Sequence, residues 1–385
     1  MKSKSALLLA MMATFLFGCN KNVVNTDPAQ PATARSVLNS NLSTLGLRNY
    51  FQNYFPIGVA CGNKNIDSAD QAALIGHEFN SLTPDNAMKW RYIHPEKNTY
   101  SWAKTDALVA FAQQHNMKVR GHVLVWHHPD VNPTWVTRDS SGQLLSKTVF
   151  LQQMRDHIFA VMTRYKGKIY AYDVVNEAVS DDPATQGALV KTYSDMYKIA
   201  GLDYIYKAFE YAHEADPDAL LFYNDNRFED PSKRDRIYTL LSQMKAAGVP
   251  LQGIGMQAHW WSNQPTRGQL QNTIVRFNGL GLKIQITELD NSVYPNENTD
   301  GKTADDYDTQ WNAEKDSIQC SQYKMYFETF IKYKDKISSV TFWNVSDRYT
   351  WRTNYPVYNR TDYPLLFDAS LQPKNAYWSV VGLVD

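Results

Sequence analysis

The stretch AYDVVNE at residues 171–177 is a short apolar run, rich in β-branched side chains, that ends in two polar residues. The stretch KIQITELD at residues 283–290 repeats this arrangement further along the chain. Such runs predict buried strands, and the polar residues predict where each strand leaves the core. Working outward from these two stretches, we expect eight strands, at residues 56–60, 81–84, 118–126, 171–176, 220–223, 253–257, 283–287 and 339–343.

Segments with the apolar spacing of helices alternate with these strands. Strict alternation of this kind implies parallel strands joined by helical crossovers. Eight such units predict an α/β fold, a single (β/α)8 TIM barrel. A dinucleotide-binding fold is disfavoured because no GxGxxG motif opens a helix after the first strand. The predicted helices span residues 68–79, 103–115, 148–165, 203–214, 232–247, 266–280, 312–333 and 373–381.

The first 19 residues have the features of an export signal. Lys2 and Lys4 precede an apolar run that is too short to span a bilayer, and Gly18 stands directly before Cys19. This pattern resembles a bacterial lipoprotein signal, in which Cys19 becomes the lipidated N-terminus; an ordinary secretory signal is the alternative. We therefore expect a signal peptide at 1–19, a flexible tether at 20–41, a folded domain at 42–385, and export to the periplasm or the cell surface.

Composition limits the class of ligand. Lys+Arg 39 balances Asp+Glu 39, so no net positive charge attracts a polyanion, and a nucleic-acid partner is disfavoured. Aromatic residues make up 13% of the chain, and such rings either fill a core or form flat platforms for sugar rings. Only Cys61 and Cys320 remain after the signal, which excludes a disulfide scaffold and leaves their pairing open.

Two glutamates, Glu177 and Glu288, each directly follow an apolar strand. In a barrel they lie at the C-terminal mouth on strands four and seven, and paired carboxylates in different environments suit glycosidic cleavage. Because side chains alternate along a strand, Glu288 and Asp290 share one face, and Gln257 and His259 share a face of the adjacent strand. An imidazole between two carboxylates would keep Glu288 ionised, as a nucleophile requires.

Other chemistries are weaker. His122, His127, His128 and His259 near one rim raise the possibility of a metal site, but there is no HExxH spacing and no cysteine pair, so no metal is expected. A Ser-His-Asp hydrolase is disfavoured because no G-x-S-x-G motif occurs.

Seven motifs in order give the chain a family resemblance. They are FPIG at 55–58, FNSLTPDNAMKW at 79–90, RGHVLVWH at 120–127, DVVNE at 173–177, YND at 223–225, GIGMQAH at 253–259 and ITELD at 286–290. Together with residues 343–352 and 364–368, this set strongly resembles glycoside hydrolase family 10, the endo-β-1,4-xylanases, over residues 42–383.

The resemblance implies a role for each matching residue. Glu177 is expected to be the general acid/base and Glu288 the nucleophile of a retaining double displacement. Asn176 would hold the sugar 2-hydroxyl, while His259 and Asp290 would support Glu288. Asn176 and Glu177 are consecutive, so a bulge or a strand end must turn both side chains into the cleft.

The same resemblance assigns the substrate-binding positions. Asn86 and Lys89 match residues that bind the sugar on the non-reducing side of the cut. The remaining matching positions, which line the sugar next to the cut or complete a cleft motif, are His122, Trp126, Gln257, Trp343, Trp351 and Asn224.

Four features depart from the family pattern. Asp85 stands where a glutamate is usual, and the segment at 128–132 is two residues longer and lacks a glutamine. Asn226 replaces a tyrosine, which removes a stacking ring on the leaving-group side. Asn344 replaces a glycine beside Trp343.

The sequence thus predicts an endo-β-1,4-xylanase that needs no cofactor, acts on xylan or xylo-oligosaccharides, and is a monomer held at a membrane by its lipid. Two alternatives stay open. One is an endo-acting β-1,4 or mixed-linkage glucanase of the same fold, and the other is a non-catalytic glycan-binding surface lipoprotein.

Overall fold

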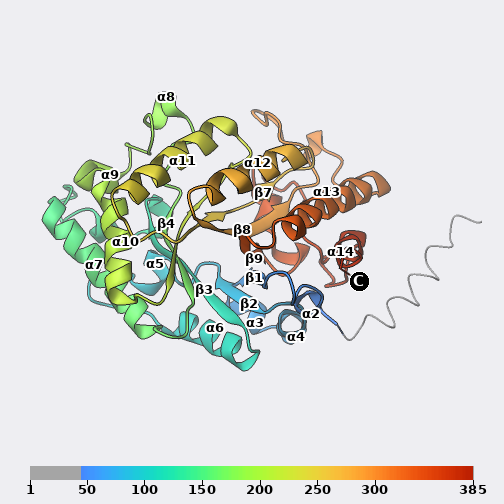
Figure 1. Ribbon diagram of the computed structural model, residues 1–385, viewed down its shortest axis with the longest axis horizontal. Helices are drawn as coiled ribbons and strands as arrows, with labels where there is room; N and C mark the ends of the chain where they lie inside the picture. The colour runs from blue at the N-terminus through green and yellow to red at the C-terminus, as the bar shows by residue number, and fades with distance from the viewer. Residues whose placement is uncertain (1–44, 385) are drawn as a thin grey trace, which may run out of the picture. The chain divides into compact units, whose positions relative to one another are not determined.

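The computed structural model describes residues 45–384. Eight parallel strands in this part of the chain form a closed barrel in the order β6-β5-β4-β3-β2-β1-β9-β8, and pairing between β6 and β8 closes it. The strands lie inside a ring of helices (Figure 1). The predicted TIM barrel is confirmed. The predicted signal peptide, the tether and Cys19 lie outside the described residues.

The strands begin and end within a few residues of their predicted positions. β8 differs most, because it continues four residues beyond the predicted end and carries Glu288 and Asp290 inside the strand. A two-residue strand, β7, pairs only with the end of β8 and was not predicted. The strands are β1 Ile57–Cys61, β2 Ser81–Pro84, β3 Lys118–Trp126, β4 Ala171–Asn176, β5 Leu220–Asp225, β6 Gly253–Met256, β7 His259–Trp260, β8 Lys283–Asn291 and β9 Ile337–Phe342.

The long helices follow the predicted segments, and their starts have a local cause. Ser146, Asp230 and Asn312 each accept a hydrogen bond from a backbone N–H of the first helical turn, which satisfies a donor that has no partner within the helix. The long helices are α4 Ala69–Glu78, α6 Ala103–Gln114, α7 Lys147–Arg164, α10 Asp203–Ala215, α11 Pro231–Ala246, α12 Arg267–Asn278, α13 Ala313–Lys332 and α14 Asn375–Val381.

Short helical turns, which the sequence patterns did not predict, occupy the loops. Most follow the C-terminal ends of strands and build the rim of the barrel. They are α2 Leu47–Tyr50, α3 Asn63–Ile66, α5 Trp90–Ile93, α8 Pro183–Gln186, α9 Asp195–Ala200, and the 3-10 turns Pro129–Val131, Thr134–Val136, Ala304–Asp306, Asp347–Tyr349 and Trp351–Asn354.

Apolar side chains fill the space between the barrel and its helices and give the strands a rigid frame. β1, β4 and β6 are buried along their whole length, as expected for parallel strands covered by helices. Cys61 is buried, Cys320 is partly buried, and both are free thiols. Within residues 45–384, no helix is both long enough and apolar enough to cross a membrane.

Candidate active site

Glu177 reaches the mouth of the barrel because the backbone turns sharply at its own position. The residue has φ 53°, a left-handed conformation that is rare for a non-glycine residue, and β4 carries a register shift between Asp173 and Val175. Its N–H donates to the carbonyl of Asn224 at 2.9 Å. The predicted bulge or strand end is therefore present, and it lets the consecutive Asn176 and Glu177 both face the site.

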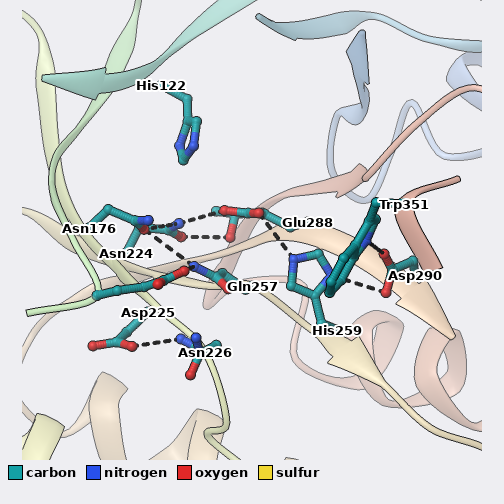
Figure 2. A network of polar contacts seen from close by, with 12 residues as sticks. His122, Asn176, Asn224, Asp225, Asn226, Gln257, His259, Glu288, Asp290 and Trp351 are labelled. Carbon is teal, nitrogen blue, oxygen red and sulfur yellow. Dashed lines mark hydrogen bonds and ion pairs between the residues drawn. The ribbon is translucent and has the colours of Figure 1, made fainter. Parts of the chain in front are cut away.

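The side chain of Asn224, from the end of β5, links Glu288 to Asn176 (Figure 2). Its Nδ2 donates to Glu288 Oε1 at 2.7 Å and to Asn176 Oδ1 at 2.8 Å. Gln257 Nε2 in turn donates to Glu177 Oε1 at 2.7 Å and lies 3.3 Å from the same Asn176 oxygen. A continuous amide network thus fixes both carboxylates, and it leaves Asn176 Nδ2 buried with no partner.

Gly255 makes this network possible. A Cβ atom at this position would lie 2.2 Å from Asn224 Oδ1, well inside van der Waals contact. The same oxygen accepts a hydrogen bond from Thr287 Oγ1 at 2.7 Å. The missing side chain on β6 therefore allows the Asn224 amide to stand between β5 and β8.

Glu288 lies at one end of a chain of alternating charges. His259 Nε2 is 3.2 Å from Glu288 Oε2, and His259 Nδ1 is 3.0 Å from Asp290 Oδ1 (Figure 2). Arg352 donates to the same Asp290 oxygen from Nε at 3.0 Å and from Nη2 at 2.7 Å, while Trp351 Nε1 donates to the other oxygen at 2.7 Å. The predicted placement of His259 between two carboxylates is confirmed.

This chain of charges controls ionisation. Burial, the largest effect on Glu288, opposes its charge, but the hydrogen bond from His259 and the positive charges around the site outweigh burial and lower the pKa of Glu288 to about 2. Burial likewise opposes the charge on His259, yet Asp290 and Glu288 raise the pKa of His259 to about 9. Glu288 is therefore an anion and His259 a cation at neutral pH.

One step of the strand-pattern reasoning was wrong. Gln257 and His259 do not share a face of one regular strand, because Ala258 between them has φ 63° and interrupts the extended backbone. β6 ends at Met256, and β7 begins at His259. The left-handed residue lets Gln257 face Glu177 while His259 faces Glu288.

A cavity of about 380 Å³ adjoins this network through Trp351, which donates to Asp290, and several predicted contact residues line it. Lys89 Nζ donates to Asn86 Oδ1 at 2.8 Å and lies 5.3 Å from the centre of the Trp126 ring. Burial lowers the pKa of Lys89, against the attraction of Glu288, Asp85 and Glu177. Residues at the ends of three strands, β1, β2 and β9, line the cavity, among them Ala60, Asp85, Asn86, Lys89, Trp343 and Trp351.

Comparison with known proteins shows the family of the chain. The sequence profile described as glycosyl hydrolase family 10 matches residues 46–383. The chain belongs to glycosyl hydrolase family 10. It is 43% identical over 337 residues to a beta-1,4-xylanase of Dictyoglomus thermophilum, covering 87% of this chain and 90% of that protein.

Two further comparisons also find xylanases. The chain is 42% identical over 342 residues to an endo-1,4-beta-xylanase of Geobacillus stearothermophilus, covering 88% of this chain and 98% of that protein. The crystal structure of an endo-1,4-beta-xylanase from Caldicellulosiruptor owensensis matches the fold with a TM-score of 0.82 at 39% identity, covering 88% of this chain and 99% of that chain.

Buried charges that the sequence reasoning missed hold the family 10 site in place. His122 Nδ1 lies 2.8 Å from Asp173 Oδ2, and Arg120 pairs with the same oxygen. Arg120 Nη2 also donates to the carbonyl of Thr287 at 2.9 Å, directly before Glu288. The usable signal was a charged residue within an apolar strand, since such a charge requires a buried partner.

Two of the positions expected to depart from the family 10 pattern are held by hydrogen bonds. Asn226 Oδ1 accepts from the buried Lys233 Nζ at 2.5 Å, and Lys233 also pairs with Asp225 at 2.8 Å, so the Asn226 amide is held in an ion-pair network. Asn344 has φ 124°, and its Nδ2 donates to the carbonyl of Tyr349 at 2.8 Å. This side chain joins Trp343 to the segment that leads to Trp351.

Two tryptophans next to His259 have structural roles. Trp260 is buried, and its ring centre lies 4.5 Å from that of Tyr326 in the core. Trp261 lies against the guanidinium of Arg352 at 4.6 Å. Among residues 45–384, no group of three or more histidine, cysteine, aspartate or glutamate side chains is arranged to hold a metal ion.

Proposed function

We propose that this family 10 glycoside hydrolase is an endo-β-1,4-xylanase, which cleaves internal bonds of xylan by a retaining double displacement. The observation that carries the proposal is Glu288, buried yet ionised, linked through Asn224, Asn176 and Gln257 to Glu177. The chain matches 90% and 98% of the length of two relatives named as xylanases, which supports xylan as the substrate.

The geometry assigns a task to each carboxyl group. Glu288 Oε2 is bound by His259 and Oε1 by Asn224, so the carboxylate is fixed for attack on the anomeric carbon. Glu177, which is less buried, donates a proton to the leaving oxygen and then takes one from the water that hydrolyses the glycosyl-enzyme. The free Nδ2 of Asn176 is available to donate to a sugar hydroxyl, a bond that strengthens in the transition state.

Azide rescue of two alanine variants tests these roles on linear xylan and chromogenic xylosides. Both Glu288→Ala and Glu177→Ala should lose nearly all xylan hydrolysis. With azide, Glu288→Ala should yield the α-glycosyl azide because azide attacks in place of the nucleophile. Glu177→Ala should yield the β-glycosyl azide because azide attacks the glycosyl-enzyme.

Other results would replace the proposal. Full xylanase activity of Glu288→Ala would remove the nucleophile assignment. An unmutated protein that cleaves a β-1,4 or mixed-linkage glucan but not xylan would establish the glucanase alternative, and binding of xylan without cleavage would establish the glycan-binding alternative.

We also propose that the enzyme is exported as a lipoprotein through Cys19 and acts as a monomer. The charged start, the apolar run and Gly18-Cys19 support lipidation. The site residues named above all lie within one chain, so the proposed chemistry requires no second subunit. Incorporation of labelled palmitate that is lost in Cys19→Ser would support the anchor, and sedimentation analysis of the protein without residues 1–19 measures the oligomeric state.

A further inference from the structure

A second cavity, of about 470 Å³, lies outside the catalytic network. Its walls are the segment that follows β3, at residues 127–138, and the segment at 193–196 that follows β4. The first of these walls contains residues 128–132, where the sequence is expected to be longer than the family pattern. None of the roles assigned above uses this cavity.

The longer segment is a rigid wall. Arg91 Nη2 donates to the carbonyls of Pro129 at 3.1 Å and Asn132 at 2.9 Å. Asn132 Nδ2 donates to the carbonyl of Trp126 at 2.5 Å and to that of His128 at 2.8 Å. The cavity is therefore preformed, and its wall is tied directly to Trp126, a residue of the catalytic cleft.

The cavity adjoins the catalytic cleft. His127 follows Trp126, and its Nε2 lies 3.4 Å from the hydroxyl of Tyr193 on the opposite wall. Lys191, two residues before Tyr193, donates its backbone N–H to the carbonyl of Ala178 at 2.9 Å, directly after Glu177. The wall that carries Tyr193 thus begins beside the acid/base.

The second cavity lies away from the expected path of the xylan backbone across the barrel. Ala60, in β1, lines the first cavity together with Lys89, and Asn226, which the family resemblance places on the leaving-group side, follows β5. In the closed eight-strand ring β1 and β5 lie opposite each other, so a polymer that crosses the mouth runs between them. The second cavity lies over β3 and β4, to one side of that line.

The lining carries no net charge. Arg91 and Arg138 are balanced by Asp130 and Asp195, and Arg138 forms a two-point ion pair with Asp195 at 2.8 and 3.0 Å. Burial, the largest effect, lowers the pKa of His127 to about 3, so its ring is uncharged at neutral pH. Such a lining favours a neutral ligand that forms many hydrogen bonds.

Tyr193 provides a platform for such a ligand. Its side chain is 49% exposed, although it lines a cavity rather than an open surface. An exposed aromatic ring beside hydrogen-bonding groups is well suited to a sugar ring. We infer that this cavity binds a neutral pentose carried as a branch on the xylan chain while the main chain occupies the cleft. This inference rests on the proposed xylanase activity.

Two variants test the inference on pure substrates. Tyr193→Ala removes the platform, and Thr134→Trp fills the cavity from an exposed position on its wall. Tyr358→Ala, which removes a ring that is 73% exposed and does not line the cavity, is the matched control. kcat/KM is measured on linear xylohexaose, on arabinose-branched xylo-oligosaccharides and on glucuronate-branched ones, with thermal unfolding to verify that each variant folds.

Both cavity variants should lose about threefold to tenfold in kcat/KM on the arabinose-branched substrate and keep their rate on linear xylohexaose, since one aromatic contact is removed or blocked. The control should match the unmutated protein on all three substrates.

Each other outcome overturns a defined part of the inference. Equal losses on linear and branched substrates would overturn the assignment of a branch sugar to the cavity and place a sugar of the xylan backbone there. Losses confined to the glucuronate-branched substrate would overturn the claim that the ligand is neutral. No loss on any substrate would overturn the claim that the cavity binds a sugar. Failure of the unmutated protein to cleave linear xylan would instead overturn the proposed function.

Discussion

Replacing His259 with glutamine separates the charge of this side chain from its capacity to donate a hydrogen bond. In the folded protein His259 Nε2 lies 3.2 Å from Glu288 Oε2 and carries a positive charge, because Asp290 and Glu288 raise its pKa to about 9. Glutamine can donate to Glu288 in place of the imidazole but brings no charge. The burial that opposes ionisation of Glu288 is then less fully offset.

The size of the effect follows from the distance. Two unit charges at 3.2 Å interact by about 5 kcal/mol at an effective dielectric constant of about 20. If the glutamine amide retains about half of this, Glu288 loses about 2–3 kcal/mol, equivalent to about two pKa units. We therefore expect the pKa of Glu288 to rise from about 2 to about 4.

The assay is the pH dependence of kcat/KM on a chromogenic xyloside, which reports the ionisations of the free enzyme. His259→Gln should move the acid limb upward by about two pH units and retain substantial activity near pH 6. His259→Ala, which also loses the donor, should be slower at every pH. His213→Gln, an exposed change on α10, is the control and should leave the profile unchanged.

An acid limb at the same pH in His259→Gln and in the unmutated protein would refute this reasoning, provided that circular dichroism shows both folded at each pH. The low pKa of Glu288 would then have to come from Asn224 and the more distant charges.

Three further predictions concern the same site. Lys89→Ala should reduce kcat/KM on short xylo-oligomers more than on long ones, which can use other contacts; an equal loss at every length, measured by product analysis, would make Lys89 structural. Asn344→Gly should change the free energy of unfolding by less than about 1 kcal/mol, because relief of the strained φ is offset by the loss of the side chain's hydrogen bonds with Tyr349, Val345 and Asn65; a shift of the denaturation midpoint equivalent to more than about 2 kcal/mol in either direction would contradict this. Because the folded pKa of His259 is raised to about 9, its contribution to stability should be complete below about pH 6.5 and be lost as pH rises through 9. The pKa of Glu288 is lowered to about 2, so its contribution should be present above about pH 4.5 and be lost as pH falls through 2. Guanidinium denaturation at a series of pH values measures both contributions, and a free energy of unfolding that does not change on the alkaline side would exclude the His259 contribution.

Local patterns predicted the barrel because each strand is an apolar run and each long helix a periodic one. Alternation along β8 correctly placed Glu288 and Asp290 on one face, since the strand continues to Asn291 although its register against β9 shifts between Ile286 and Leu289. The same rule failed for Gln257 and His259, because the rule assumes extended backbone and Ala258 is left-handed. Nothing in the type of residue 258 indicates this conformation.

Long-range partners were beyond the reach of sequence patterns. The bond from Asn224 to Glu288 and the pairing of Arg120 with Asp173 depend on how strands distant in sequence are aligned in the closed barrel. The roles proposed for Glu177 and Glu288 came from their motifs. The amide network between them could be found only once the register of β4, β5, β6 and β8 was known.

The row of charges from Arg352 through Asp290 and His259 to Glu288 also limits how this enzyme can be altered. Removing one member leaves a buried neighbour uncompensated, so single substitutions in the row should interact rather than add. A double change that removes adjacent opposite charges, such as Arg352→Met with Asp290→Leu, should therefore cost less folding stability than the sum of its parts. Useful variation along this row is accordingly confined to coordinated pairs, and a search by single substitutions would pass over it.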